Sequence, residues 1–230
     1  MKNAFMRTMA TVGSVLATAV LVISSAIPAQ ARSDIDLEGI RSRLSDAGVD
    51  AATQDRLMAK LLAGGTWDSV SGAQPVAETT VVSGDREITT RLYADGSPIV
   101  SSIEIPRNGL QDRVGRAISG CREGSGAGNF PFYDCRVQTN TALYTISFLS
   151  DGRRSSIGQA QVSNYRQIGY WTGAATVNST GFNLVRRDQS GSSPAHVQGT
   201  LYVTFLLGSG SGVYNLSFYV RDTSRWDSTP

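Results

Sequence analysis

The sequence predicts a mainly β protein (α+β overall), in which a helical hairpin and a small β-meander precede an antiparallel β-sandwich. Apolar residues recur at helical spacing in residues 34–65, whereas short alternating segments between glycine-containing turns fill most of the remaining chain. The only two cysteines, Cys121 and Cys135, bracket a short glycine- and serine-rich stretch. Many short strands without intervening helices are typical of an antiparallel sandwich.

Residues 1–31 are predicted to be a signal peptide that is removed on export. Lys2 and Arg7 form a basic start, residues 12–27 are apolar, and Ala29-Gln30-Ala31 offers the small residues that a signal peptidase reads. The apolar run is shorter than the roughly 20 residues of a spanning helix and contains several hydroxyl side chains. We therefore expect a secreted, extracellular protein with no membrane span in the mature chain.

The charge balance excludes two classes of partner. The whole chain has 21 basic and 19 acidic residues, and the predicted signal peptide contains two of the basic residues and no acid. The mature chain, with 19 of each, has a formal charge of zero. A nucleic-acid-binding protein normally carries a basic surplus on one face, and a polybasic membrane-surface protein would carry one too. We therefore expect neither function.

Residues 32–109 are predicted to form the first region, a helical hairpin followed by a three-stranded meander. Asp36 and Asp50 are expected to cap the two helices, which end at Gly48 and at Gly64-Gly65. Core packing is the favoured role of their apolar faces, over binding of a partner. The meander strands are expected at 78–82, 86–93 and 99–105, joined by turns that contain Gly84 and Gly96.

Residues 110–230 are predicted to form the second region, a sandwich with a disulfide between Cys121 and Cys135. Two cysteines in an exported chain most simply pair, and closing this loop is expected to contribute about 3 kcal/mol. The two cysteines would supply only two of the four ligands of a structural zinc site, and the single histidine, His196, is far away in sequence. The expected strands are 143–149, 156–165, 174–177, 182–185, 197–207 and 213–221, with turns at Asp151-Gly152 and at the later glycine-serine segments.

The segment from Cys135 to Trp226 resembles a family of secreted β-domain proteins of Gram-positive bacteria to which no activity is assigned. The resemblance is carried by CRV, LYTISFLSD, IGQAQVSNYRQIGYW, FNLVR, AHVQGTLYVTFLL and YNLSFYVRD, in this order. Earlier in the chain, LLAGGTWDS and YADGS are similar to the helical leaders found with such domains. The resemblance implies a secreted β-domain with an N-terminal helical hairpin, and it implies no site residues.

No motif in the sequence carries a recognisable chemistry. His196, the only candidate for the base of a nucleophilic triad, stands at the start of a predicted strand, where an exposed or edge-strand histidine is expected instead. We therefore predict no catalytic residue, no metal site and no cofactor. The alternative is a secreted polysaccharide or cell-wall hydrolase that uses two loop carboxylates. Its candidate acids are Glu123, Asp134, Asp151 and Asp188.

Exposed aromatic residues are the candidate binding surface. Phe130, Phe132 and Tyr133 lie in the disulfide loop, and Tyr170 and Trp171 follow in a later segment. They either form a platform for a ligand or close the open edges of the sandwich. For Phe130 and Phe132 the packing role is favoured. For Tyr170 and Trp171 ligand binding and edge packing are equally favoured. The sequence thus favours a non-catalytic binding or structural protein that acts at the cell envelope, on a cell-wall polysaccharide ligand or on an extracellular protein. An inhibitor or toxin that presents its disulfide loop is a third hypothesis.

Overall fold

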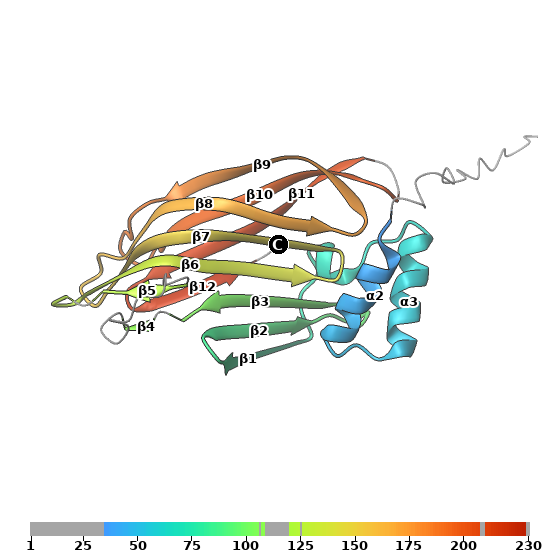
Figure 1. Cartoon of the computed structure of the whole chain (residues 1–230), viewed down its shortest axis with the longest axis horizontal. Coiled ribbons are helices and arrows are strands. Elements are labelled where there is room, and N and C mark those ends of the chain that lie inside the picture. The colour runs from blue at the N-terminus through green and yellow to red at the C-terminus, as the bar shows by residue number, and fades with distance from the viewer. Residues whose placement is uncertain (1–34, 106, 109–119, 125, 208–209, 229–230) are drawn as a thin grey trace, which may run out of the picture.

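The structure, a computed structural model, describes residues 35–105, 107–108, 120–124, 126–207 and 210–228, so the predicted signal peptide lies outside the described residues. The elements are, in chain order, the helices α2 (Leu37–Asp46) and α3 (Ala51–Leu62), the 3-10 helix η1 (Asp68–Val70), and the strands β1 (Ala77–Ser83), β2 (Arg86–Leu92), β3 (Pro98–Glu104), β4 (Arg107–Asn108), β5 (Arg122–Glu123), β6 (Asn129–Thr141), β7 (Tyr144–Ser155), β8 (Gln161–Thr172), β9 (Ala175–Arg186), β10 (Ala195–Phe205), β11 (Ser211–Arg221) and β12 (Ser224–Ser228) (Figure 1).

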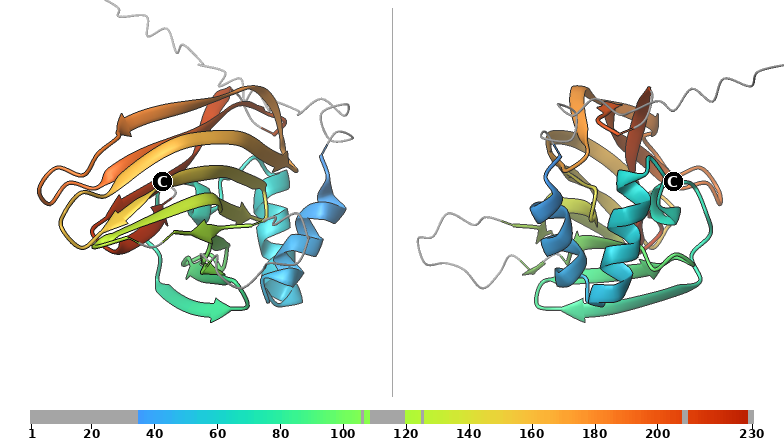
Figure 2. Two further views of the ribbon diagram at one scale, coloured as in Figure 1. Left: turned by 60° about the vertical axis from the view of Figure 1, so that its left-hand side comes forward. Right: turned by 90° about the vertical axis from the view of Figure 1, so that its right-hand side faces the viewer.

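The two helices form the predicted hairpin and lie together at one end of the molecule (Figures 1 and 2). Asp36 and Asp50 cap them as predicted, since their carboxylates accept the backbone N–H groups of Gly39 at 2.8 Å and of Thr53 at 3.0 Å. Gly48, in the turn between the helices, has a φ of +76°, which a residue with a side chain adopts only at a cost. The caps and this turn fix where each helix starts and stops.

The apolar faces of the helices pack on the β-structure. Trp67, which follows α3, is almost fully buried, and its indole N–H donates to the carbonyl oxygen of Leu57 at 2.8 Å. The buried helical side chains are Ile40, Leu44, Leu57, Met58 and Leu61. Together with the buried residues of the strands they belong to one hydrophobic cluster. The helical hairpin and the sandwich therefore share a core.

The larger sheet, sheet A, is an antiparallel series in the order β1-β2-β3-β6-β7-β8. Strand β3 pairs with the second half of β6, from Val137 to Thr141, and the short β5 pairs with its first half, at Phe132 and Tyr133. The three predicted meander strands thus form and continue directly into the sheet of the sandwich. The predicted boundary at residue 109 falls outside the described residues.

The smaller sheet, sheet B, has the order β12-β11-β10-β9 and packs on sheet A, which completes the predicted sandwich (Figure 1). Inward side chains of the two sheets interdigitate: Phe132 of sheet A meets Phe218 of sheet B edge to face, with ring centroids 6.1 Å apart. The largest fully buried side chains of the sandwich are Phe132, Phe148, Phe218, Ile146, Leu201 and Leu216.

Four sequence expectations about strand positions were wrong. The strand expected at 156–165 is β8, which begins only at Gln161 and continues to Thr172. Phe130, Phe132 and Tyr133, which were expected in a loop, lie in the first part of β6, which pairs with β5 as a hairpin. Asp151-Gly152 is no turn but lies inside β7, where a Cβ on Gly152 would be 2.4 Å from the ring of Phe132. The glycine is therefore needed for close packing. The segments 174–177 and 182–185 belong to one continuous strand, β9.

Candidate functional site

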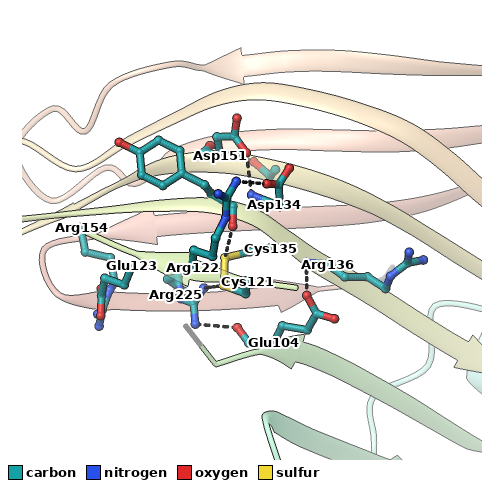
Figure 3. The surroundings of a disulfide bond; sticks show 12 residues. Glu104, Cys121, Arg122, Glu123, Asp134, Cys135, Arg136, Asp151, Arg154 and Arg225 are labelled. Carbon is teal, nitrogen blue, oxygen red and sulfur yellow. Dashed lines mark hydrogen bonds and ion pairs between the residues drawn. A yellow bond between two sulfur atoms is a disulfide. The ribbon is translucent and has the colours of Figure 1, made fainter. Parts of the chain in front are cut away.

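Cys121 and Cys135 form the predicted disulfide, which joins the start of β5 to β6 and is buried (Figure 3). Arg225 of β12 reaches it from sheet B. One guanidinium nitrogen of Arg225 lies 3.7 Å from the sulfur of Cys121, and the other donates to the carbonyl oxygen of Glu104 at 2.8 Å. Burial, and then the charge of Arg154, lower the pKa of Arg225 to about 10. The disulfide thus lies in a packed region that ties the two sheets together.

The aromatic residues beside the disulfide do not form a platform. Phe132 is 0% exposed and packs in the core, which confirms the favoured packing role and excludes it from the candidate binding surface. It points inward because β6 alternates, and Gly152 opposite makes room for its ring. Tyr133, the next residue along the strand, is 44% exposed. Phe130 is half-buried, with the guanidinium of Arg154 5.8 Å from its ring centroid.

Tyr170 and Trp171 are neighbours in β8 and therefore point to opposite faces of sheet A. Tyr170 is 52% exposed at the edge of the sheet. Trp171 lies on the outer face, where the guanidinium of Arg43 sits 3.8 Å from its ring centroid and covers the ring. From the register on β7, Trp171 is nine residues, or about 30 Å, from Phe130. The five candidate aromatics therefore do not share one surface.

The four acids of the hydrolase hypothesis all accept hydrogen bonds from cationic or amide side chains. The pairs are Glu123 with Arg154, Asp134 with Arg122 and Arg166, Asp151 with Arg166 and Asn164, and Asp188 with Gln161 (the first three acids are drawn in Figure 3). Asp134 and Asp151 are held side by side, since the backbone N–H of Asp134 donates to Asp151 at 2.8 Å. Arginine side chains occupy the carboxylates of Glu123, Asp134 and Asp151, and a glutamine amide donates to that of Asp188. The arrangement therefore gives the hydrolase hypothesis no support.

A buried acid that the sequence analysis did not single out is Asp227 of β12. Burial raises its pKa, while the nearby hydroxyl of Ser101 and the charge of Arg91 act in the opposite direction. Asp227 is 6% exposed and pairs with Phe218 of β11, so its side chain lies on the inner face of sheet B.

The outer face of sheet B carries a stack of aromatic rings across three strands. His196 stacks on Tyr219 with centroids 4.2 Å apart, and Tyr219 stacks on Trp226 at 5.4 Å. Burial, and then the charge of Arg186, lower the pKa of His196, which favours its neutral form. Because the rings stack face to face, their edges and not their faces are directed to solvent. The stacked side chains also stabilise the pairing of the three strands. His196 lies at the start of a strand as predicted, but it is half-buried in β10, which pairs with β9 and β11 on its two sides, so the expectation of an exposed or edge-strand histidine was wrong.

A more suitable site lies where the helical hairpin meets the outer face of sheet A. Two adjoining depressions of about 340 and 460 Å³ share Ala47 of the interhelical turn and Pro98 of β3. We call them together the hairpin groove. The first depression is lined chiefly by Arg43, Asp46, Val100, Gln138 and Asn140, and the second by Val49, Asp50, Thr53, Thr79, Thr90 and Leu92.

The floor of the first depression is a chain of hydrogen bonds. The Oδ1 of Asn140 accepts from the amide of Gln138 at 3.0 Å and from the hydroxyl of Thr145 at 2.9 Å. The guanidinium of Arg43 donates to that same hydroxyl at 2.8 Å. The amide nitrogen of Asn140 has no protein partner among the described residues. Arg43 and Asn140 are thus held in place with donor groups left for a ligand.

The sequence positions these residues through two local rules. Gln138 and Asn140 alternate with the buried Val137 and Thr139 along β6, so both amides face outward. The Gly48 turn brings the end of α2 over this face. The alternation along β6 is the one sequence pattern from which the outward direction of Gln138 and Asn140 could be predicted. No local pattern in the sequence predicts that Arg43 lies beside them.

A second set of contacts fixes α3, the far wall of the groove. Lys60 forms ion pairs with Asp68 at 3.1 Å and with Asp95 at 2.9 Å. The latter carboxylate also accepts the backbone N–H of Asp68 and the hydroxyl of Ser97. Burial alone would raise the pKa of Asp95, but these bonds outweigh it and lower the pKa to about 2. The turn before β3 is therefore locked to α3.

Within the described ranges, no group of three or more His, Cys, Asp or Glu residues is placed to hold a metal ion, and no helix has the length and apolar character needed to cross a bilayer. The chain matches no protein-family model, no curated protein and no solved structure at a significant level. The resemblance to secreted Gram-positive β-domain proteins therefore stays a prediction.

Proposed function

We propose that the protein is an exported, non-catalytic binding protein that recognises hydroxyl-rich ligands of the cell envelope, such as cell-wall polysaccharide, through the hairpin groove. The observation that carries the proposal is the hydrogen-bonded floor of the first depression, where Thr145 links Arg43 to Asn140, which also accepts from Gln138. An extracellular protein partner is the other ligand class that the sequence leaves open.

The chemistry of the groove suits such a ligand. Planar amides and hydroxyl groups can pair with sugar hydroxyls, while Val100 and Leu92 offer small apolar surfaces to the C–H groups of a sugar ring. Arg43 and Asp46 lie at one end of the groove, where the arginine provides a charged hydrogen-bond donor and the aspartate a charged acceptor. This mixture fits a neutral polar polymer better than a purely apolar ligand.

The rigidity of the groove also supports binding. Its floor is a central strand of sheet A, and its far wall is fixed by the Lys60–Asp95 ion pair. A site that is ordered before the ligand arrives loses little conformational entropy on binding. The disulfide and the predicted signal peptide support action outside the cell, where such bonds persist.

The proposal is tested by titrating the mature protein with solubilised cell-wall polysaccharide, and by retention on insoluble cell wall, for the native protein and for Asn140→Ala. We expect saturable binding that falls about tenfold or more in the variant, since a buried hydrogen bond to a ligand contributes roughly 1–2 kcal/mol.

Asn215→Ala is the matched control. Asn215 lies on the outer face of sheet B, is half-buried and accepts a threonine hydroxyl (Thr200) at 3.0 Å, as Asn140 accepts that of Thr145 at 2.9 Å. It should bind like the native protein. Equal loss in both variants, or no binding to any polysaccharide or cell-wall preparation, would refute the proposed function.

A further inference from the structure

Strand β1 is a free edge of sheet A. All seven of its residues are exposed, and among the described elements its substantial contacts are with β2 alone. It is the outermost strand of the sheet, with no labelled element beyond it (Figure 1). Val81 and Val82 are 51% and 68% exposed. Both faces of β1 and one of its edges are therefore open to solvent.

The hydrogen-bond register shows which backbone groups point outward. The N–H of Ile105 donates to the carbonyl of Asp85, and the N–H of Tyr93 donates to that of Ser97, so the odd-numbered residues of β2 face β3. The even-numbered residues of β2 then bond β1 through its residues 77, 79, 81 and 83. Glu78, Thr80 and Val82 are left with N–H and C=O groups directed away from the sheet.

Nothing in β1 blocks a further strand. Natural edge strands are protected by lysine, proline, a bulge within the pairing or very short length. The sequence of β1 is AETTVVS, which contains neither lysine nor proline, and its pairing with β2 runs over seven residues without a register shift. Three consecutive outward positions with two β-branched side chains are well suited to strand addition.

We propose that β1 pairs antiparallel with β1 of a second copy of this chain, about a two-fold axis through Thr80. In this register Thr80 lies opposite Thr80 of the second copy, and Glu78 lies opposite its Val82. All three outward pairs of backbone groups are satisfied. Glu78 is the only charged residue in β1, and the axis keeps the two copies of Glu78 four residues, or about 13 Å, apart. The edge is therefore complementary to itself in hydrogen bonding and free of like-charge contact.

The two-fold axis is perpendicular to the sheet, so the two copies of sheet A become one continuous sheet with the same face outward. Thr79, which lines the hairpin groove, is on the face opposite to Thr80. Both grooves of the dimer would consequently open on the same face. Pairing itself does not depend on the proposed function, but two grooves on one face would bind a repeating polymer more tightly than one groove.

The test is oxidative cross-linking, in the absence of any ligand, of variants of the mature protein that carry one cysteine in β1 in addition to the Cys121–Cys135 disulfide. In a hydrogen-bonded antiparallel pair the two Cα atoms are about 5.5 Å apart, which is within the range of a disulfide. Thr80→Cys should therefore give a covalent dimer at protein concentrations at which sedimentation of the native chain shows reversible dimers. A single short strand pair is a small interface, so we expect dissociation constants of about micromolar or weaker.

Two controls test the register. Val82→Cys alone should not cross-link, because the two copies of residue 82 are about 13 Å apart. A mixture of Glu78→Cys and Val82→Cys should form a heterodimer. A monomer at all concentrations up to about 1 mM would overturn the proposal. Cross-linking of Val82→Cys as fast as Thr80→Cys would overturn it as well. Cross-linking of Thr80→Cys to another protein, with the native chain monomeric, would assign the edge to a different partner.

Discussion

The guanidinium of Arg43 lies 3.8 Å from the ring centroid of Trp171 and donates to the hydroxyl of Thr145 on the adjacent strand. This contact joins α2 to the outer face of sheet A at the end of the hairpin groove. Burial lowers the pKa of Arg43, yet a guanidinium stays charged at any ordinary pH. One arginine thus fixes the helix, covers the tryptophan and supplies a charge to the groove.

Replacing Arg43 should weaken both stability and binding. Arg43→Ala loses a cation–π contact and a hydrogen bond, and we expect the free energy of unfolding to fall by about 1–2 kcal/mol. Urea denaturation measures the loss. Arg41→Ala, in which a solvent-exposed pair with Asp55 is removed from the same helix, should cost at most about 0.5 kcal/mol. Equal losses of unfolding free energy in the two variants would show that the contact between Arg43 and Trp171 does not stabilise the fold.

The carboxylate of Asp95 should make stability depend on acid. Its folded-state pKa of about 2 is below the ordinary value of 3.8, so the unfolded chain binds more protons between these values. The stabilisation is full above about pH 4 and is lost as the pH falls through about 2. We expect a loss of roughly 1–2 kcal/mol, a figure reduced for the water that still reaches the carboxylate.

The measurement is the free energy of unfolding between about pH 2 and pH 5 for the native protein and for Asp95→Asn. The variant should show a flatter profile and lower stability at pH 5. Asp55→Asn, at an exposed ion pair, is the control that should keep the native profile. A native-like slope in Asp95→Asn would show that another group carries the acid dependence.

Phe132 and Tyr133 should respond to truncation in opposite ways. Phe132 is fully buried, and Phe132→Ala is expected to cost about 3–5 kcal/mol because it leaves a cavity between the sheets. Tyr133→Ala removes a side chain that is 44% exposed and should change stability by about 0.5 kcal/mol or less. Thermal unfolding compares them. A mild effect of Phe132→Ala would contradict its place in the core.

Reduction of the disulfide should destabilise the sandwich without removing the groove. Cys121 and Cys135 are 14 residues apart, and opening such a loop is expected to cost about 3 kcal/mol in the unfolding equilibrium. Calorimetry of Cys121→Ser/Cys135→Ser against the native protein measures the loss. The double variant should still bind polysaccharide while folded, because the groove is built from other strands.

The sequence predicted those elements whose signals are local. The cap residues Asp36 and Asp50 and the Gly48 turn defined the helices, and strict alternation marked most of the strands. Glycine was misread where it serves packing: Gly152 was assigned to a turn because its neighbour is an aspartate, although the ring of Phe132 occupies the space beside it. A glycine signals a turn or a close approach equally well.

The hairpin groove could not be predicted from the sequence, because the residues that line it come together only in the folded chain. Arg43 and Asn140 are far apart in sequence, and they come together because the last turn of α2 and the end of β6 line the same depression. One error followed from another: residues 170 and 171 were expected in no strand, whereas they lie in β8, where alternation places Tyr170 and Trp171 on opposite faces. Aromatic neighbours in a strand therefore do not indicate a shared platform.

Hydrogen exchange of the mature protein, with and without saturating cell-wall polysaccharide, tests the hairpin groove most directly. Amides of the end of α2, of β3 and of residues 138–141 should exchange more slowly when the ligand is present, because a bound ligand suppresses local opening. Residues 195–205, on the opposite sheet, should be unchanged. Protection on the outer face of sheet B, with none beside Arg43 and Asn140, would contradict the assignment of the groove as the binding site.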